Sequence, residues 1–434
     1  MTTSRFSLDS RYFPNISPRA FYSPHDLAVH MRADAIDLMR LGDQNYRLRW
    51  LEDRLPILVH EYQHSVDHLG TVAGRKLLDS LLSALFGLSQ KLRGGPRELP
   101  RMIAYHDLQR RFYRKAYFTE FRPDYRSAGP GRPRWRWSTS IGTGFDSEGR
   151  LNENDPILFV RFTDEDQKVL VSRQPLTAAA LFETRAVYAE IDHDARTVAG
   201  KGEGSPEWKK FNLRQQEMFY DQSLTLYSAP AHIVASQAGI TDPIDAYRLA
   251  AKAAGIVLNL TPELELDCEL PKRFAGEALG RARRLQEILD LGYIFAALAV
   301  SAPKYEGDDD AWLNGALAKV GLPSSEYILD AACKYLSLPT SNEPGDLMQI
   351  YLNAVSAGIG NFQRLRGSYG LLDFEHMTKC GTNYGPMALP HVVLANDALA
   401  ASLMPVISLV DQRTMSNASR LLHDHLDEFL DACR

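Results

Sequence analysis

The segment LVHEYQHSVDHLGT, residues 58–71, carries the most specific pattern in this chain of 434 residues. Its apolar side chains recur at spacings of three and four, as they do along one face of an α-helix: Val59, Tyr62, Val66 and Leu69. Pro56 stands just before them, where proline fits the first turn of a helix or a kink in a longer one. The pattern predicts a helix over residues 57–70.

The opposite face of this helix carries an H-E-x-x-H motif, with His60 at its start and His64 at its end. Residues four apart on a helix lie one above the other, so both imidazoles can bind the same metal ion. Zinc suits such a site because it accepts neutral imidazole nitrogen and tolerates open tetrahedral coordination. The motif therefore predicts one Zn²⁺ per chain, bound by His60 and His64.

Glu61 lies between the two histidines in the sequence but is rotated about 100° from His60, because a helix has about 3.6 residues per turn. Its carboxylate is therefore expected beside the metal, where it can take a proton from zinc-bound water. A metal ion lowers the pKa of such a water to about 7. We predict Glu61 as the general base of a hydrolytic site.

A catalytic zinc site needs a third protein ligand. Gly70 stands where the H-E-x-x-H-x-x-G-x-x-H pattern would place a third histidine, so that class of site is excluded. Asp67 and His68 lie too close along the same helix to complete a three-ligand face easily. We expect Asp67 to be a partner of His64, and His68 to lie behind the ligands or in solvent.

The H-E-x-x-H motif and a later amphipathic segment, LTAAALFETRAVYAEI at 176–191, together resemble the glutamate-type zincins, a branch of the zinc metallopeptidases. In that family a second helix with the pattern E-x-x-A-x-x-x-E supplies the third ligand, and Glu183, Ala186 and Glu190 match it. The resemblance implies Glu183 as the third zinc ligand, with Glu190 as the alternative. It also implies that the chain hydrolyses peptide bonds of a protein or peptide substrate.

The resemblance covers residues 60–190 and departs from the family at one position. Thermolysin-like zincins have an aspartate four residues after the ligand glutamate, where it orients a ligand histidine, and this chain has Val187 there. That orienting role would have to pass to Asp67, Asp192 or a backbone carbonyl. A donor for the oxyanion of the tetrahedral intermediate is also needed, and spacing selects none of the chemically able side chains: Tyr188, Tyr220, His232, His376 and His391.

Most of the remaining sequence favours helices. Strand patterns are confined to residues 134–172, where RWRWSTSIG alternates and ILFVRF and KVLVS are rich in β-branched and aromatic residues. From Leu176 the helical pattern continues almost to the end of the chain. We predict a predominantly α-helical α+β fold: an irregular N-terminal arm over 1–30, a zincin-like catalytic region over 31–198 and an all-α C-terminal domain over 207–434.

Residues 91–136 are basic, with thirteen Lys or Arg against four acids, and aromatic residues lie between the basic ones. The expectation is a solvated helix whose Arg and Tyr stems pack on the domain surface. A docking surface for an acidic protein, which would use Arg110, Arg111 and Arg114, is a second interpretation. Nucleic acid is a third and less favoured partner, since arginines can follow phosphates while aromatics stack on bases.

The composition, 45% hydrophobic and 24% charged residues, is that of an ordinary soluble globular protein, long enough for two or three domains. Four widely spaced cysteines predict reduced thiols rather than a disulfide framework. The start of the chain lacks a secretory pattern, and the most apolar stretch, 291–300, is half of the about 20 residues that a membrane span needs. We therefore expect a cytoplasmic protein without membrane contact. Two other functions stay open: a zinc-containing helical interaction protein without peptidase activity, and a nucleic-acid-associated factor that uses 91–136.

Overall fold

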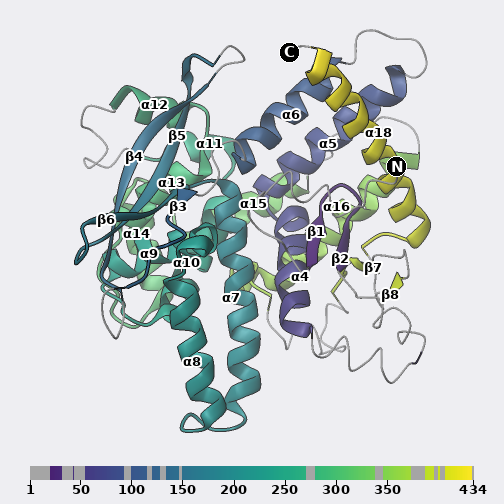
Figure 1. Ribbon diagram of the computed structural model, residues 1–434. Helices are drawn as coiled ribbons and strands as arrows, with labels where there is room; N and C mark the ends of the chain where they lie inside the picture. The colour runs from purple at the N-terminus through teal and green to yellow at the C-terminus, as the bar shows by residue number, and fades with distance from the viewer. Residues whose placement is uncertain are drawn as a thin grey trace. The chain divides into compact units, whose positions relative to one another are not determined.

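A computed structural model gives the structure of the chain (Figure 1). It describes residues 20–31, 43, 54–91, 99–114, 120–127, 133–145, 149–269, 279–337, 346–372, 387–394, 399–400 and 406–432. The described residues contain fourteen α-helices and two four-stranded sheets, so the predicted helix-rich α+β class is confirmed. The chain separates into two compact units. Unit 1 combines Met1–Arg111 with Cys333–Arg434, and unit 2 is Phe112–Ala332. This division does not follow the boundaries drawn from the sequence, and those domains stay predictions.

Unit 1 contains the H-E-x-x-H helix and a small sheet. Its helices are α4 (Leu55–Gly70), α5 (Val72–Lys91), most of α6 (Leu99–Tyr113), α16 (Asp346–Leu365) and α18 (Leu409–Ala432), with the 3₁₀ turn η5 (Arg366–Ser368). The strands are β1 (Ala20–Ser23), β2 (Ala28–Met31), β7 (His391–Leu394) and β8 (Leu399–Ala400), in the order β1-β2-β7-β8. The β2–β7 pair is parallel, and the other two pairs are antiparallel.

Two expectations about unit 1 need correction. The first 30 residues were expected to form an irregular surface arm, but residues 20–31 form an antiparallel strand pair in which β2 is buried throughout. Strands β7 and β8 also interrupt the C-terminal region that was expected to be all-α. Strands this short carry little periodicity, and β2 finds its partner β7 more than 350 residues later in the chain, so local pattern could not reveal either.

Helix α4 packs closely on α16 because glycines occupy the point of contact. A Cβ atom on Gly358 would lie 2.1 Å from the carbonyl oxygen of Leu69, and one on Gly70 would lie 3.3 Å from the carbonyl oxygen of Gly358. The contact between α4 and α5 is equally close, because a Cβ on Gly74 of α5 would lie 2.3 Å from the carbonyl oxygen of Asp67. Only residues without a side chain permit such backbone approaches, so these glycines allow α4 to pack closely on α16 and α5.

Unit 2 is a helical body with one antiparallel sheet. The sheet consists of β3 (Glu120–Phe121), β4 (Trp135–Phe145), β5 (Leu151–Asp164) and β6 (Val169–Pro175), in the order β3-β6-β5-β4. Strands β4 to β6 match the β segment predicted over 134–172, and the short β3 lies before it. The helices are α7 (Ala178–Ala199), α8 (Pro206–Phe219), α9 (Thr225–Ala238), α10 (Pro243–Leu258), α11 (Pro262–Leu266), α12 (Leu279–Glu287), α13 (Leu291–Ser301), α14 (Asp309–Lys319) and most of α15 (Ser325–Leu336), with the 3₁₀ turn η3 (Gln222–Leu224). Helix α7 is central, because it packs against α8, α9, α10 and α13.

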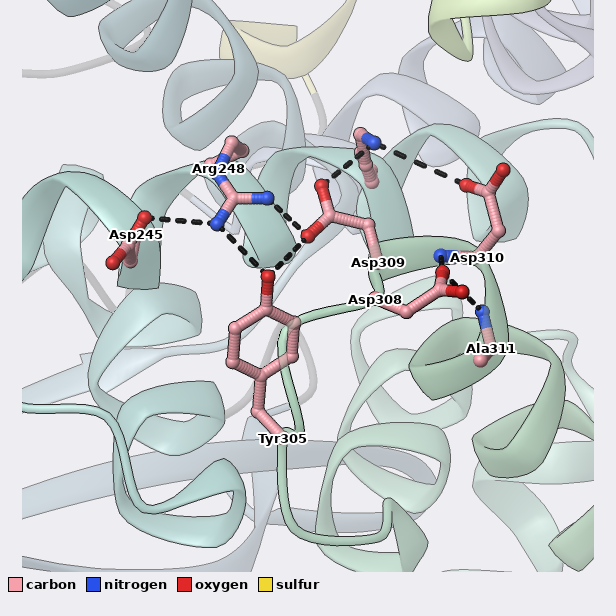
Figure 2. A network of polar contacts seen from close by, with 8 residues as sticks. Asp245, Arg248, Tyr305, Asp308, Asp309, Asp310 and Ala311 are labelled. Atoms are coloured by element: carbon pink, nitrogen blue, oxygen red, sulfur yellow. Dashed lines mark hydrogen bonds and ion pairs between the residues drawn. The ribbon is translucent and has the colours of Figure 1, made fainter.

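A charged network ties α10 to the start of α14 (Figure 2). Arg248 donates to Asp309 and, at 2.8 Å, to Asp245, while the Lys252 ammonium lies 2.7 Å from Asp309. The Tyr305 hydroxyl donates to Asp309 at 2.8 Å. Burial by itself would raise the pKa of Asp309, but hydrogen bonds from Arg248, Lys252 and Tyr305 hold the pKa below its usual value. Asp309 is therefore a charged structural anchor.

The apolar stretch 291–300 is part of α13, whose residues Gly292–Ala299 are all buried in unit 2. It is thus a core helix of the folded protein. Among the helices of the described ranges, none is long and apolar enough to cross a membrane. Cys268 and Cys333 are free thiols, and the other two cysteines lie outside the described residues.

Candidate metal centre

Helix α4 begins at Leu55, two residues before the predicted start at residue 57, with Pro56 in its first turn, and it ends at Gly70 as predicted. The apolar positions Val59, Val66 and Leu69 are buried, as their spacing indicates. From Gln63 to Gly70, however, every residue of the helix is buried, the polar ones included. The second half of α4 is therefore enclosed on all sides, and its polar side chains must find hydrogen-bond partners inside the protein.

The two histidines of the motif lie next to each other on α4. The ring centroids of His60 and His64 are 4.9 Å apart, with the rings nearly perpendicular. His64 is 9% exposed and His60 is half-buried. The adjacent rings are the arrangement that the i, i+4 spacing predicts.

His68 continues the same helix face but is buried, so the option that it lies in solvent is wrong. Its Nδ1 donates to the backbone carbonyl of His64 at 2.8 Å, and its ring packs against Tyr22 with centroids 5.4 Å apart. It thus stands behind the histidine pair and fixes the backbone at His64.

Asp67 is fully buried and accepts a hydrogen bond from Gln63; its expected partnership with His64 stays a prediction. Gln63 Nε2 donates to Asp67 Oδ1 at 2.9 Å and to the carbonyl of Gly370 at 3.0 Å, while Gln63 Oε1 accepts from the backbone N–H of Leu372 at 2.7 Å. The second variable position of H-E-x-x-H therefore fastens α4 to the segment that follows α16. Motif spacing carries no signal for this contact, because the partner lies about 300 residues away.

Glu61 is 6% exposed, and one of its oxygens has a fixed partner. The backbone N–H of Tyr22 in β1 donates to Glu61 Oε2 at 2.7 Å. The sequence could not predict this contact, because β1 is only four residues long and lies in a region expected to be irregular.

Glu183 lies in the first half of α7 and is 7% exposed. The helix begins at an N-cap, Thr177, whose side chain accepts from the N–H of Ala180. The neighbours of Glu183 hold the helix in place: Thr184 donates to the carbonyl of Tyr227 at 3.0 Å and Arg185 to that of Ala251 at 3.0 Å. The buried setting of Glu183 differs from the surface position of an ordinary helix glutamate.

The other acids of α7 that the sequence brought into question have cationic partners. Glu190 lies 3.4 Å from Arg214, and Asp192 lies 2.8 Å from Arg196. An ion pair with an exposed arginine gives each of these carboxylates a structural role. Asp192 therefore has a structural explanation that does not involve a ligand histidine.

The structure groups three of the predicted site residues. His60, His64 and Glu183 each offer one ligand atom, and these three atoms lie within 4.8 Å of one another. Among the described residues, this is the group of His, Cys, Asp or Glu side chains that could hold a metal ion. Two imidazole nitrogens and one carboxylate oxygen are a donor set that suits a divalent transition metal. These three side chains are therefore a group that could hold a metal ion.

Two of the candidate oxyanion donors, His232 and His391, have structural contacts. His232 donates to the carbonyl of Phe219 at 2.8 Å inside an aromatic cluster, and burial lowers its pKa to about 4. His391 donates to the carbonyl of Ile407 at 3.0 Å. His376 lies outside the described residues. Both His232 and His391 are buried, and each lies in the core of its own unit.

The basic segment 91–136 is only partly a surface. Arg114, expected to be available for docking, is 2% exposed and donates to Asp155 at 2.6 Å, so it belongs to the core of unit 2. Arg110 and Arg111 are exposed. The aromatic side chains Tyr105, Phe112 and Tyr125, which would stack on bases, are buried.

Comparison with known proteins finds no matching family model, no matching curated protein and no matching solved structure. The resemblance to zincins stays a prediction from the sequence motif and the glutamate of α7.

Proposed function

We propose that this protein is a zinc-dependent metallopeptidase in which His60, His64 and Glu183 hold the ion and Glu61 is the general base. The observation that carries the proposal is the grouping of three ligand atoms within 4.8 Å. The motif and the glutamate of α7 lie more than a hundred residues apart in the sequence, so their grouping is independent of the helical spacing that first suggested the site.

A divalent ion bound there would supply Lewis acidity and make a water molecule nucleophilic near neutral pH. The remaining roles belong to residues of the chain. His60 and His64 would bind the ion through neutral imidazole nitrogens, Glu183 would add a negative charge, and the carboxylate of Glu61 would accept a proton from the water. Zinc is the metal we propose, because His₂Glu is one of its recurrent catalytic donor sets.

Three Glu→Gln variants distinguish the proposed base, Glu61, from the proposed metal ligand, Glu183. Glu61→Gln should keep zinc and lose hydrolysis of a protein substrate such as casein by about 10²–10⁴-fold, the usual contribution of general-base catalysis. Glu183→Gln should lose both hydrolysis and zinc, because a neutral amide is a poorer ligand than a carboxylate. Glu190→Gln is the matched control: the same change on the same helix, at a glutamate that pairs with Arg214.

Metal analysis after dialysis, beside the cleavage assay, distinguishes the outcomes. Zinc retained by Glu183→Gln but lost by Glu190→Gln would move the third ligand to Glu190. Zinc bound at one ion per chain without any turnover would favour a zinc-containing interaction protein. Full activity in Glu61→Gln would end the proposed mechanism.

A further inference from the structure

The edge strand β1 contacts the proposed base directly. β1 is the first strand of its sheet, and Tyr22 pairs with Val29 of β2 on one side. The Tyr22 N–H donates to Glu61 Oε2 at 2.7 Å, so it points towards α4 rather than into the ladder. Both residues are buried, at 7% and 6% exposure, and a charged hydrogen bond is stronger where water is excluded.

The turn that joins β1 to β2, residues 24–27, is held by the C-terminal helix α18. Gln412 Nε2 donates to Asp26 Oδ2 at 3.0 Å, and Ser419 Oγ donates to the carbonyl of His25 at 2.8 Å. The ring of His25 also packs edge-on against His423, with centroids 4.6 Å apart. The turn is therefore fixed from the side of α18 by two buried hydrogen bonds and a ring contact.

We propose that β1 positions Glu61, with the Tyr22 N–H holding Oε2 in place, and that α18 keeps β1 in place. The catalytic meaning of this anchor rests on the proposed function of Glu61. A glutamate side chain has three rotatable bonds, and a base acts efficiently only when it is held within hydrogen-bond reach of its proton. The backbone N–H supplies that restraint without adding another titratable group.

Amide exchange of Tyr22 tests the anchor without any catalytic assay. Selective ¹⁵N-tyrosine labelling limits the NMR spectrum to the nineteen tyrosine amides, and the peak missing from Tyr22→Phe identifies Tyr22. Glu61→Ala removes the acceptor, so the Tyr22 amide should exchange at least about tenfold faster, the factor that corresponds to about 1.4 kcal/mol. The amide of Tyr351, inside helix α16, should not change.

A pair of hydroxyl deletions on α18 tests the second layer. Ser419→Ala removes the bond to the turn and should speed the exchange of Tyr22. Thr414→Ala removes an exposed hydroxyl that donates only within α18, to Val410 at 3.0 Å, and should leave the exchange unchanged. Equal effects of both variants would overturn the role of α18.

Kinetics then connect the anchor to the reaction. Tyr22→Pro removes the N–H, which proline lacks, and should lower kcat by about 10–100-fold, as loss of a supporting contact does, with KM and zinc content unchanged. Tyr22→Ala keeps the N–H and loses the ring, so its loss of kcat should be smaller. Unchanged Tyr22 exchange in Glu61→Ala would overturn the anchor. Altered exchange in a protein without peptidase activity would support the anchor and overturn the proposed function instead.

Discussion

The position of the metal-motif helix depends on Gly358 of α16, and Gly358→Ala is the sharpest test of that packing. A Cβ at this position would lie 2.1 Å from the carbonyl oxygen of Leu69, where ordinary contact begins at 3.4 Å. The two backbones would have to separate by about 1.3 Å, the difference between these distances. Backbone atoms cannot turn aside as a flexible side chain can, so the strain falls on the whole contact between α4 and α16.

Overpacking of a well-packed core costs about 1–3 kcal/mol, and a backbone clash belongs at the upper end. Unit 1 has about 200 residues, a size at which each kcal/mol shifts the melting temperature by about 2–4 °C. We therefore expect Gly358→Ala to melt about 6–12 °C below the wild type. Differential scanning calorimetry of the full chain measures this directly.

Gly360→Ala is the matched control, two residues further along the same helix. A Cβ there would meet nothing within 4 Å. Replacing glycine by alanine inside a helix gains up to about 1 kcal/mol, so this variant should melt slightly above the wild type. If Gly358→Ala melts with or above Gly360→Ala, the close approach of α4 and α16 is wrong.

Three further predictions concern charge and metal. Arg114→Ala should destabilise unit 2 by about 3–5 kcal/mol in urea unfolding, because Asp155 would be left buried without its cation, whereas the exposed Arg111→Ala should change stability by less than about 0.5 kcal/mol. Burial lowers the pKa of His232 to about 4 in the folded protein, so the unfolded chain binds the proton more tightly. The folding stability that is present above the unfolded pKa of about 6.5 should therefore be lost as the pH falls towards 4. Unfolding at pH 7 and 4.5 checks this, and His232→Gln should show a weaker pH dependence. Zinc at about one hundred times its Kd should stabilise the wild type by about 2.7 kcal/mol and leave His64→Ala unaffected.

The sequence predicted those elements whose pattern is local and long. The helix around H-E-x-x-H, the strands of 134–172 and the start of α7 all have clear periodicity, and the structure contains each of them. The sequence did not predict β1 and β2, because four-residue strands show no usable alternation, and β2 is buried on both faces. It also treated Arg114 as a surface charge, because composition does not tell which arginine of a basic segment meets a buried aspartate.

For the candidate site, the sequence by itself determined that His60 and His64 share a face and that Glu61 stands beside them. Helical geometry follows from backbone sterics within a few residues, so spacing alone predicts it. The tertiary structure adds Glu183 to the group of residues that could hold a metal ion, and it pairs Glu190 with Arg214. It also decided that a backbone N–H from β1 meets Glu61. These contacts join segments far apart in the chain, and they depend on the packing of whole helices and strands, which no local spacing encodes.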